Sequence, residues 1–114
     1  MFKTMLVDGS RYFRKLVKDT LKYQFPAMDI MEATGRVEAF QKIASRPPNL
    51  IFMDIRLPGE NGLELTRKIK KDYPHIMMII LTNHDLPEYR EAATRSKVNY
   101  FLSKSSMATD EISS

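Results

Sequence analysis

The sequence predicts an α/β fold, a doubly wound parallel five-stranded sheet with helices on both faces. Two apolar runs, 50–53 and 76–81, are interpreted as strands because their unbroken apolar residues leave no side for solvent. Segments with helical spacing alternate with strand-like segments along the chain, and the connectors between them are a few residues long. Such alternation is typical of parallel sheets, because each crossover places a helix on one face of the sheet.

The first strand and first helix are expected at the very start of the chain. The apolar segment 4–7 predicts a strand that ends at Asp8, and Ser10 is a suitable N-cap for a helix over 11–24. Pro26 then ends this helix. Its inward positions recur at near-helical spacing: Phe13, Leu16, Val17, Leu21 and Tyr23 or Phe25.

A weak strand and a second helix are expected next. Residues 29–33 predict the strand, and Gly35 opens a helix over 36–44. The inward positions of that helix are predicted to be Val37, Phe40 and Ile43. Two prolines then form a stiff connector into the strand at 50–53, which ends at Asp54.

The segment after Asp54 is rich in turn residues and leads into a third helix. Asn61 and Glu64 resemble a capping pair for a helix over 62–72. The apolar side of this helix is formed by Leu63, Leu65 and Ile69. The strand at 76–81 has the strongest buried-strand pattern in the chain and stops at Thr82.

The last third of the chain is predicted to hold a weak helix and a fifth strand. Asp85 and Glu88 are candidates to cap the helix, which tolerates Pro87 in its first turn and reaches about Ser96. Its inward candidates are only Leu86, Tyr89, Ala92 and Ala93. A strand at 99–102 then ends before Lys104, and residues 105–114 begin a fifth helix at best, short or truncated.

Composition narrows the functional classes. The 114 residues predict a single domain, and a net charge of +4 without clustered Lys or Arg predicts no nucleic-acid binding. The chain has no cysteine, which is compatible with the reducing cytoplasm, and no apolar run of membrane-spanning length. His75 and His84 have no paired ligand spacing, so no zinc site is expected.

Four strand ends carry polar side chains. Asp8, Asp54, Thr82 and Lys104 each follow or close a predicted parallel strand, so they are expected at one rim of the sheet, where open α/β folds bind ligands. Each residue also has an ordinary alternative. Asp8 could cap the first helix. Asp54 and Thr82 could be strand-end residues without a role, and Lys104 could be a surface lysine.

The segment from Met53 to Gly62 resembles the phosphoacceptor segment of bacterial two-component response-regulator receiver domains, of the chemotaxis-regulator type. That family has an aspartate after its third strand, a proline four residues on and a glycine eight residues on, which matches Asp54, Pro58 and Gly62. The resemblance covers nearly the whole chain. It implies a flavodoxin-like (βα)5 fold with strand order 2-1-3-4-5, and a single receiver domain over 1–114.

The resemblance also implies a role for each rim residue. Asp54 is expected to be the phosphoacceptor, with Thr82 and Lys104 contacting the phosphoryl oxygens. Mg²⁺ is expected to bind the side chains of Asp8 and Asp54 and the backbone carbonyl of Arg56. Phe101, with Thr82, matches the family's switch pair, although a core phenylalanine in a strand is an equally ordinary explanation.

One position departs from the family pattern. The family has two adjacent acids after its first strand, whereas this sequence has Asp8 followed by Gly9. The loss of one carboxylate suggests weak Mg²⁺ binding and slow or conditional phosphorylation. A simpler interpretation is that Gly9 only eases the turn into the first helix.

The resemblance implies a switch and not an enzyme. A histidine kinase or phosphotransfer protein is the expected donor, and the face of the fourth helix, fifth strand and final helix is expected to engage an output domain or a second copy. The alternative is a degenerate receiver that binds proteins without phosphorylation, which Gly9 favours. An aspartate-nucleophile phosphohydrolase is disfavoured because Arg56 stands where its second acid is needed, and no Gly-rich nucleotide-binding loop occurs.

Overall fold

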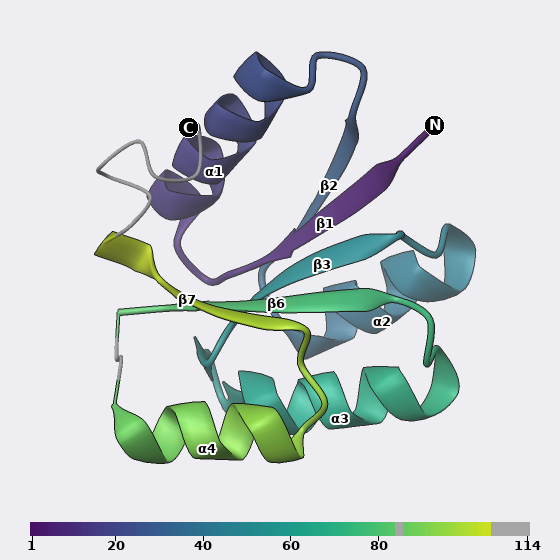
Figure 1. Ribbon diagram of the computed structural model, residues 1–114. Helices are drawn as coiled ribbons and strands as arrows, with labels where there is room; N and C mark the ends of the chain where they lie inside the picture. The colour runs from purple at the N-terminus through teal and green to yellow at the C-terminus, as the bar shows by residue number, and fades with distance from the viewer. Residues whose placement is uncertain (84–85, 106–114) are drawn as a thin grey trace.

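The computed structural model describes residues 1–83 and 86–105, and a parallel sheet lies at its centre (Figure 1). Five strands form this sheet in the order β2-β1-β3-β6-β7, and every neighbouring pair is parallel. When these five strands are numbered one to five along the chain, their order is the predicted 2-1-3-4-5. They are β1 (Lys3–Val7), β2 (Asp29–Ala33), β3 (Leu50–Asp54), β6 (Met77–Thr82) and β7 (Tyr100–Ser103).

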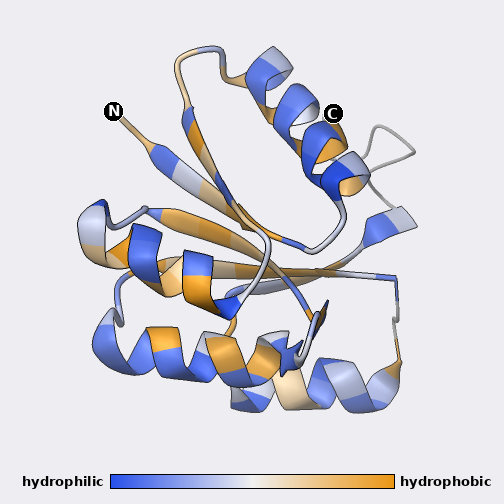
Figure 2. Ribbon diagram, turned by 180° about the vertical axis from the view of Figure 1, so that it is seen from behind, coloured by the Kyte–Doolittle hydropathy of each residue, from blue (hydrophilic) through white to orange (hydrophobic). Residues whose placement is uncertain are grey.

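The helices cover both faces of the sheet, as predicted. In Figure 1, α1 lies on one side, and α2, α3 and α4 lie on the other. Viewed from behind and coloured by hydropathy, each helix carries both hydrophilic and hydrophobic residues, as expected for helices that bury one side (Figure 2). The helices are α1 (Arg11–Gln24), α2 (Arg36–Ser45), α3 (Gly62–Asp72) and α4 (Pro87–Arg95).

The central strand β3 divides the hydrophobic core in two. All five of its residues are buried, as its apolar run predicts. Ile51 and Met53 belong to the larger core cluster on the side of α2 and α3, whereas Leu50 and Phe52 belong to a smaller cluster with Val17 of α1. Alternate residues of a strand point to opposite faces, so β3 contributes to both cores.

The starts of α1 and α3 follow the predicted capping chemistry, whereas the N-caps of α2 and α4, Gly35 and Leu86, make no side-chain cap bond. The Phe13 N–H donates to the Ser10 hydroxyl over 3.1 Å, and the Asn61 side chain accepts from Leu63 N–H over 2.8 Å and Glu64 N–H over 3.4 Å. Pro87 occupies the first turn of α4. The expected cap Asp85, the loop residue His84 and the predicted final helix at 106–114 lie outside the described residues.

Four predicted inward positions were wrong, and helix geometry explains each. Val37 of α2 is 69% exposed and Tyr23 of α1 is also exposed, because each lies two positions from a buried residue and so on the far side of its helix. Phe25 and Leu86 are exposed as well. They lie at the C-cap of α1 and the N-cap of α4, where the backbone is no longer helical.

The turn-rich segment after Asp54 forms a small hairpin that the sequence did not predict. β4 (Arg56–Leu57) and β5 (Glu60–Asn61) pair antiparallel, with Pro58 and Gly59 at the tip. Gly59 has a φ of +67°, a conformation that suits glycine. The hairpin returns the chain to the end of β3, and α3 begins there.

Candidate functional site

Strand register brings the predicted polar residues to one edge of the sheet. Val7 pairs with Met53, so the residues that follow them, Asp8 and Asp54, lie side by side at the carboxyl ends of β1 and β3. Asp54 in turn pairs with Leu81 of β6, and Thr82 follows directly. The sheet edge therefore determines where these side chains lie.

Lys104 connects the two carboxylates. Its Nζ lies 2.8 Å from Oδ2 of Asp8 and 3.3 Å from Oδ2 of Asp54. The side chains of Lys104, Asp8 and Asp54 are only 9%, 8% and 11% exposed. We call these three residues the acidic pocket. Because two buried carboxylates repel each other, a shared ammonium between them stabilises the arrangement.

Asp8 is fixed by the start of α1. The Ser10 N–H donates to Oδ1 of Asp8 over 2.8 Å, and the Arg14 guanidinium donates to the Asp8 carbonyl over 2.6 Å. Arg14 is in turn paired with Glu32 of β2 at 2.9 Å. One carboxylate oxygen of Asp8 is therefore occupied by a backbone donor, and the other faces Lys104.

Burial raises the pKa of Asp54, and the charge of Asp8 raises it further. The Lys104 ammonium and the Arg56 N–H act in the opposite direction by stabilising the carboxylate, but the net direction is upward. The ionised form of Asp54 is therefore costly in this pocket. A cation that approaches Asp54 would lower that cost.

Phe13 is a site residue that sequence reasoning placed only in the core. The Lys104 Nζ lies 4.3 Å from the centre of the Phe13 ring, which is a cation–π distance. Phe13 also packs against the smaller core cluster. Its place in the first turn of α1, just after Asp8, was the available signal, because that turn lies at the carboxyl edge of the sheet.

Gly62 is required by a close approach of two backbone segments. A Cβ atom at this position would lie 1.8 Å from the Asp54 carbonyl oxygen, and the Gly62 N–H donates to the Ile55 carbonyl over 2.6 Å. The spacing between Asp54 and Gly62 therefore has a steric cause. Only glycine allows the start of α3 to lie against the end of β3.

Gly9 is packed against the tip of the hairpin. A Cβ atom at position 9 would lie 3.1 Å from Cδ and 3.2 Å from Cγ of Pro58. A larger residue would require Pro58 to move by a few tenths of an ångström. The glycine at position 9 therefore has two consequences. It removes a carboxylate from the pocket, and it lets the chain pack closely against Pro58.

The other predicted residues occupy different surroundings. Thr82 is fully buried at the end of β6, next to the rim, and pairs in register with Ser103. Phe101 is partly buried against the larger core, and the Arg90 guanidinium lies 4.8 Å from its ring centre. Arg56 is exposed in β4, and its backbone N–H lowers the pKa of Asp54.

The donor set of the acidic pocket suits a hard divalent cation such as Mg²⁺. Among residues 1–83 and 86–105, no group of three or more His, Cys, Asp or Glu side chains could hold a metal. Asp8 and Asp54 nevertheless offer carboxylate oxygens, and Mg²⁺ is commonly held by one or two carboxylates while it keeps several waters. The pair is therefore a plausible Mg²⁺ site with few protein ligands.

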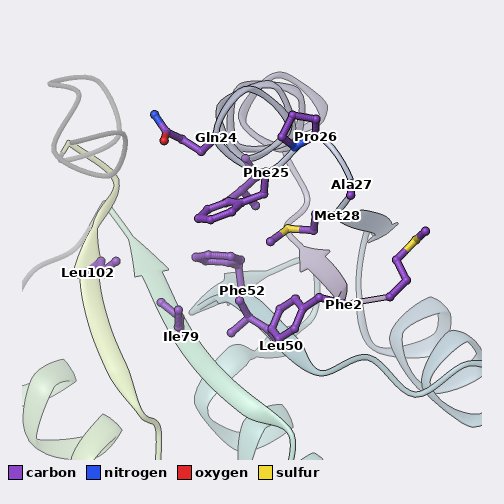
Figure 3. A pocket seen from close by; sticks show the side chains of 12 residues that line it. Phe2, Gln24, Phe25, Pro26, Ala27, Met28, Leu50, Phe52, Ile79 and Leu102 are labelled. Carbon is purple, nitrogen blue, oxygen red and sulfur yellow. The ribbon is translucent and has the colours of Figure 1, made fainter.

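A second hollow has the opposite character. We call it the apolar groove, a pocket of about 950 Å³ beside α1, in which the Phe25 and Phe52 rings face each other (Figure 3). Apart from Gln24, its lining carries only apolar side chains. The lining residues are Met1, Phe2, Leu21, Gln24, Phe25, Pro26, Ala27, Met28, Leu50, Phe52, Ile79 and Leu102.

No helix in the described part of the chain is both long and apolar enough to cross a membrane.

Comparisons with known proteins agree with this geometry. The family model described as "Response regulator receiver domain" matches residues 4–113. The oxygen regulatory protein NreC of Staphylococcus epidermidis is 30% identical over 105 residues, which cover 91% of this chain and 48% of that protein. The chain thus spans about half the length of this relative, and a smaller share, 28%, of the regulatory protein YesN of Bacillus subtilis.

Solved structures show the same fold. A LuxR-family two-component response regulator from Aurantimonas has a TM-score of 0.85 and 26% identity. The match covers 97% of this chain and 79% of that one. A CheY-like receiver domain protein from Methanospirillum hungatei has a TM-score of 0.82 and 20% identity, with 100% of this chain and 99% of that one covered.

Proposed function

The chain belongs to the response regulator receiver family of two-component systems, and from this premise we propose that Asp54 accepts a phosphoryl group from a phosphohistidine. The donor would be a histidine kinase or a phosphotransfer protein. The observation that carries this proposal is the Lys104 ammonium within 3.3 Å of a buried Asp54 carboxylate. We further propose that the domain extends over 1–114 and acts as a switch, since receiver domains are generally not enzymes.

The chemistry requires one bond to form and one to break. An Asp54 carboxylate oxygen bonds to phosphorus while the P–N bond to the donor imidazole breaks, and the leaving nitrogen takes the electron pair and then a proton. The Lys104 ammonium would move to contact the phosphoryl oxygens as negative charge develops on them, because its long side chain allows that movement. Thr82 is buried at the next strand end, and its hydroxyl would donate a hydrogen bond to another phosphoryl oxygen.

Mg²⁺ would be held by the side chains of Asp8 and Asp54 and the backbone carbonyl of Arg56. When bound, it would neutralise negative charge between the carboxylates and the incoming phosphoryl group. Asp8 is well suited to this role because α1 fixes both its backbone and one carboxylate oxygen. Gly9 supplies no further carboxylate, so we expect weak binding.

The phosphoryl signal would reach the surface through α4 and β7. Ala93 is the only buried residue of α4, so this helix is held by few core contacts and can shift at low cost. Thr82 and Phe101 lie in neighbouring strands, and Arg90 of α4 covers the Phe101 ring. We propose that this face binds an output domain or a second copy.

Phosphodonor treatment tests the proposal. The protein is incubated with phosphoramidate and Mg²⁺, and intact mass spectrometry with peptide mapping should find one added phosphoryl group on Asp54. Asp54→Asn should gain none, whereas Asp19→Asn, at an exposed carboxylate that pairs with Lys15, should behave as wild type. A wild-type mass that stays unchanged, also with Mn²⁺, would favour the alternative of a degenerate receiver, which rests on the carboxylate missing at Gly9.

A further inference from the structure

We propose that Phe13 is a positioning residue that holds Lys104 across Asp8 and Asp54, so that the ammonium competes with divalent cations for the acidic pocket. This inference deepens the proposed function and rests on it for the role of the metal. Lys104 would then do two things in sequence. It occupies the cation position in the resting protein, and a metal ion releases it.

The surroundings of the Lys104 ammonium are complete. Two carboxylate oxygens lie at 2.8 and 3.3 Å, and the Phe13 ring lies at 4.3 Å. An ammonium group has three protons and no acceptor, so the two anions and the ring face give it favourable contacts in several directions. The Phe13 ring is held by packing against the smaller core. The backbone at Phe13 is held as well, because its N–H donates to the Ser10 hydroxyl.

Competition follows from which oxygens are free. Oδ1 of Asp8 accepts the Ser10 N–H, so Oδ2 is the oxygen left for a metal ion, and it is the one that Lys104 contacts. Oδ2 of Asp54 contacts the same ammonium. A divalent cation at these oxygens and the Lys104 ammonium repel each other, so binding of the metal favours displacement of Lys104.

Metal affinity in variants tests the inference. Isothermal titration with Mn²⁺ and with Mg²⁺ compares wild type with Phe13→Leu, which keeps an apolar side chain but removes the ring. We expect Phe13→Leu to bind about 2- to 5-fold more tightly, because the competing ammonium is held less firmly. Phe13→Tyr retains a ring face and should bind as wild type does, and the exposed neighbour Tyr12→Leu should also leave affinity unchanged.

A second variant removes the competitor. Lys104→Met should bind Mn²⁺ at least about tenfold more tightly, since the cation then meets two uncompensated carboxylates. Circular dichroism checks that this variant folds, and if it does not, Phe13→Leu decides alone. Equal affinity in wild type and Phe13→Leu, or weaker binding in the variant, would overturn the inference, and so would undetectable binding in both.

The outcome is separable from that of the proposed function. The readout is metal affinity and needs no phosphoryl transfer. If Asp54 accepts no phosphoryl group but Phe13→Leu still tightens Mn²⁺ binding, the competition holds and only the phosphoacceptor role fails. If Asp54 is phosphorylated but affinity is unchanged in Phe13→Leu, the competition is wrong and the phosphoacceptor role stands.

Discussion

The acidic pocket and the apolar groove border the same sheet, and strands β3 and β7, or the residue after them, contribute to both. At the carboxyl ends, Asp54 and Lys104 form a compact cluster in which each charge faces an opposite one. Along the α1 face, Phe52 and Phe25 enclose a wide space lined by apolar side chains. One hollow is small and fully occupied by its own side chains, and the other is large and open.

The difference shows how position along a strand decides chemistry. In the middle of β3, side chains alternate between two apolar cores, and a charge there would have no partner. At the strand end, backbone donors and a lysine from another strand can reach a carboxylate. The carboxyl edge is therefore the place where this fold tolerates buried charge.

The largest effect is expected where the acidic pocket depends on backbone contact. Gly62→Ala places a Cβ atom 1.8 Å from the Asp54 carbonyl oxygen, so α3 or β3 must move. We expect a loss of more than about 4 kcal/mol in the free energy of unfolding, measured by urea denaturation. Gly35→Ser is the matched control, because a Cβ there meets nothing within 4 Å, and a loss as large in this control would contradict the steric explanation.

A smaller loss is expected on the groove side of the same strand. Phe52→Ala removes a buried ring from the smaller core and should cost about 3 kcal/mol in the free energy of unfolding. The value falls at the low end for such a change because the ring borders an open groove rather than a closed cavity. A cost below about 1 kcal/mol would mean that the groove wall contributes little to the core.

The acidic pocket should also make stability depend on pH. Since the folded-state pKa of Asp54 is raised, the folded protein holds the proton more tightly than the unfolded chain does. Stability should therefore fall as pH rises from the ordinary aspartate pKa through the raised one, and then level off. Asp54→Asn lacks this fall and should be more stable than wild type at neutral pH, on the order of 1 kcal/mol.

Thermal unfolding of the two proteins at a series of pH values measures this difference. The curves should approach each other at acidic pH, where Asp54 is protonated in wild type. A wild-type protein that is more stable than Asp54→Asn at neutral pH would show that Lys104 outweighs burial and the charge of Asp8.

The smallest effect is expected at the outer wall of the groove. Phe25 lies at the C-cap of α1 and is 56% exposed, so Phe25→Ala removes little buried surface. We expect a loss of less than about 1 kcal/mol in the free energy of unfolding, measured as for Phe52→Ala. A loss similar to that of Phe52→Ala would mean that the groove is closed in solution.

The sequence predicted those features that depend on strand order and strand ends. Asp8 and Asp54 could be placed together because parallel strands share one carboxyl edge, and the buried character of β3 followed from its apolar run. The first-turn position of Phe13 placed it near the carboxyl edge, but its stacking on Lys104 also depends on how α1 tilts over the sheet, which the sequence does not show. The same holds for Gly62, whose steric cause lies in a contact between a helix start and a strand end.

Helix faces were harder to predict than strand ends. In α2 the apolar residues fit more than one face, and Val37 was assigned to the core although Ala39 and Ile43 are the buried pair. A small residue such as alanine gives a weak signal in a hydrophobic pattern, yet it allows the helix to pack closely on the sheet. The error therefore came from weighting side-chain size over spacing.

The contact between Gly9 and Pro58 means that restoring an acid after the first strand also affects the hairpin. An aspartate at position 9 adds a carboxylate and also pushes on the hairpin tip, since its Cβ lies 3.1 Å from the proline ring. Any gain in Mg²⁺ affinity in Gly9→Asp would thus be combined with a shift of the neighbouring loop. The double variant Gly9→Asp/Pro58→Ala separates the two, because it adds the carboxylate and removes the proline ring that the new Cβ would meet.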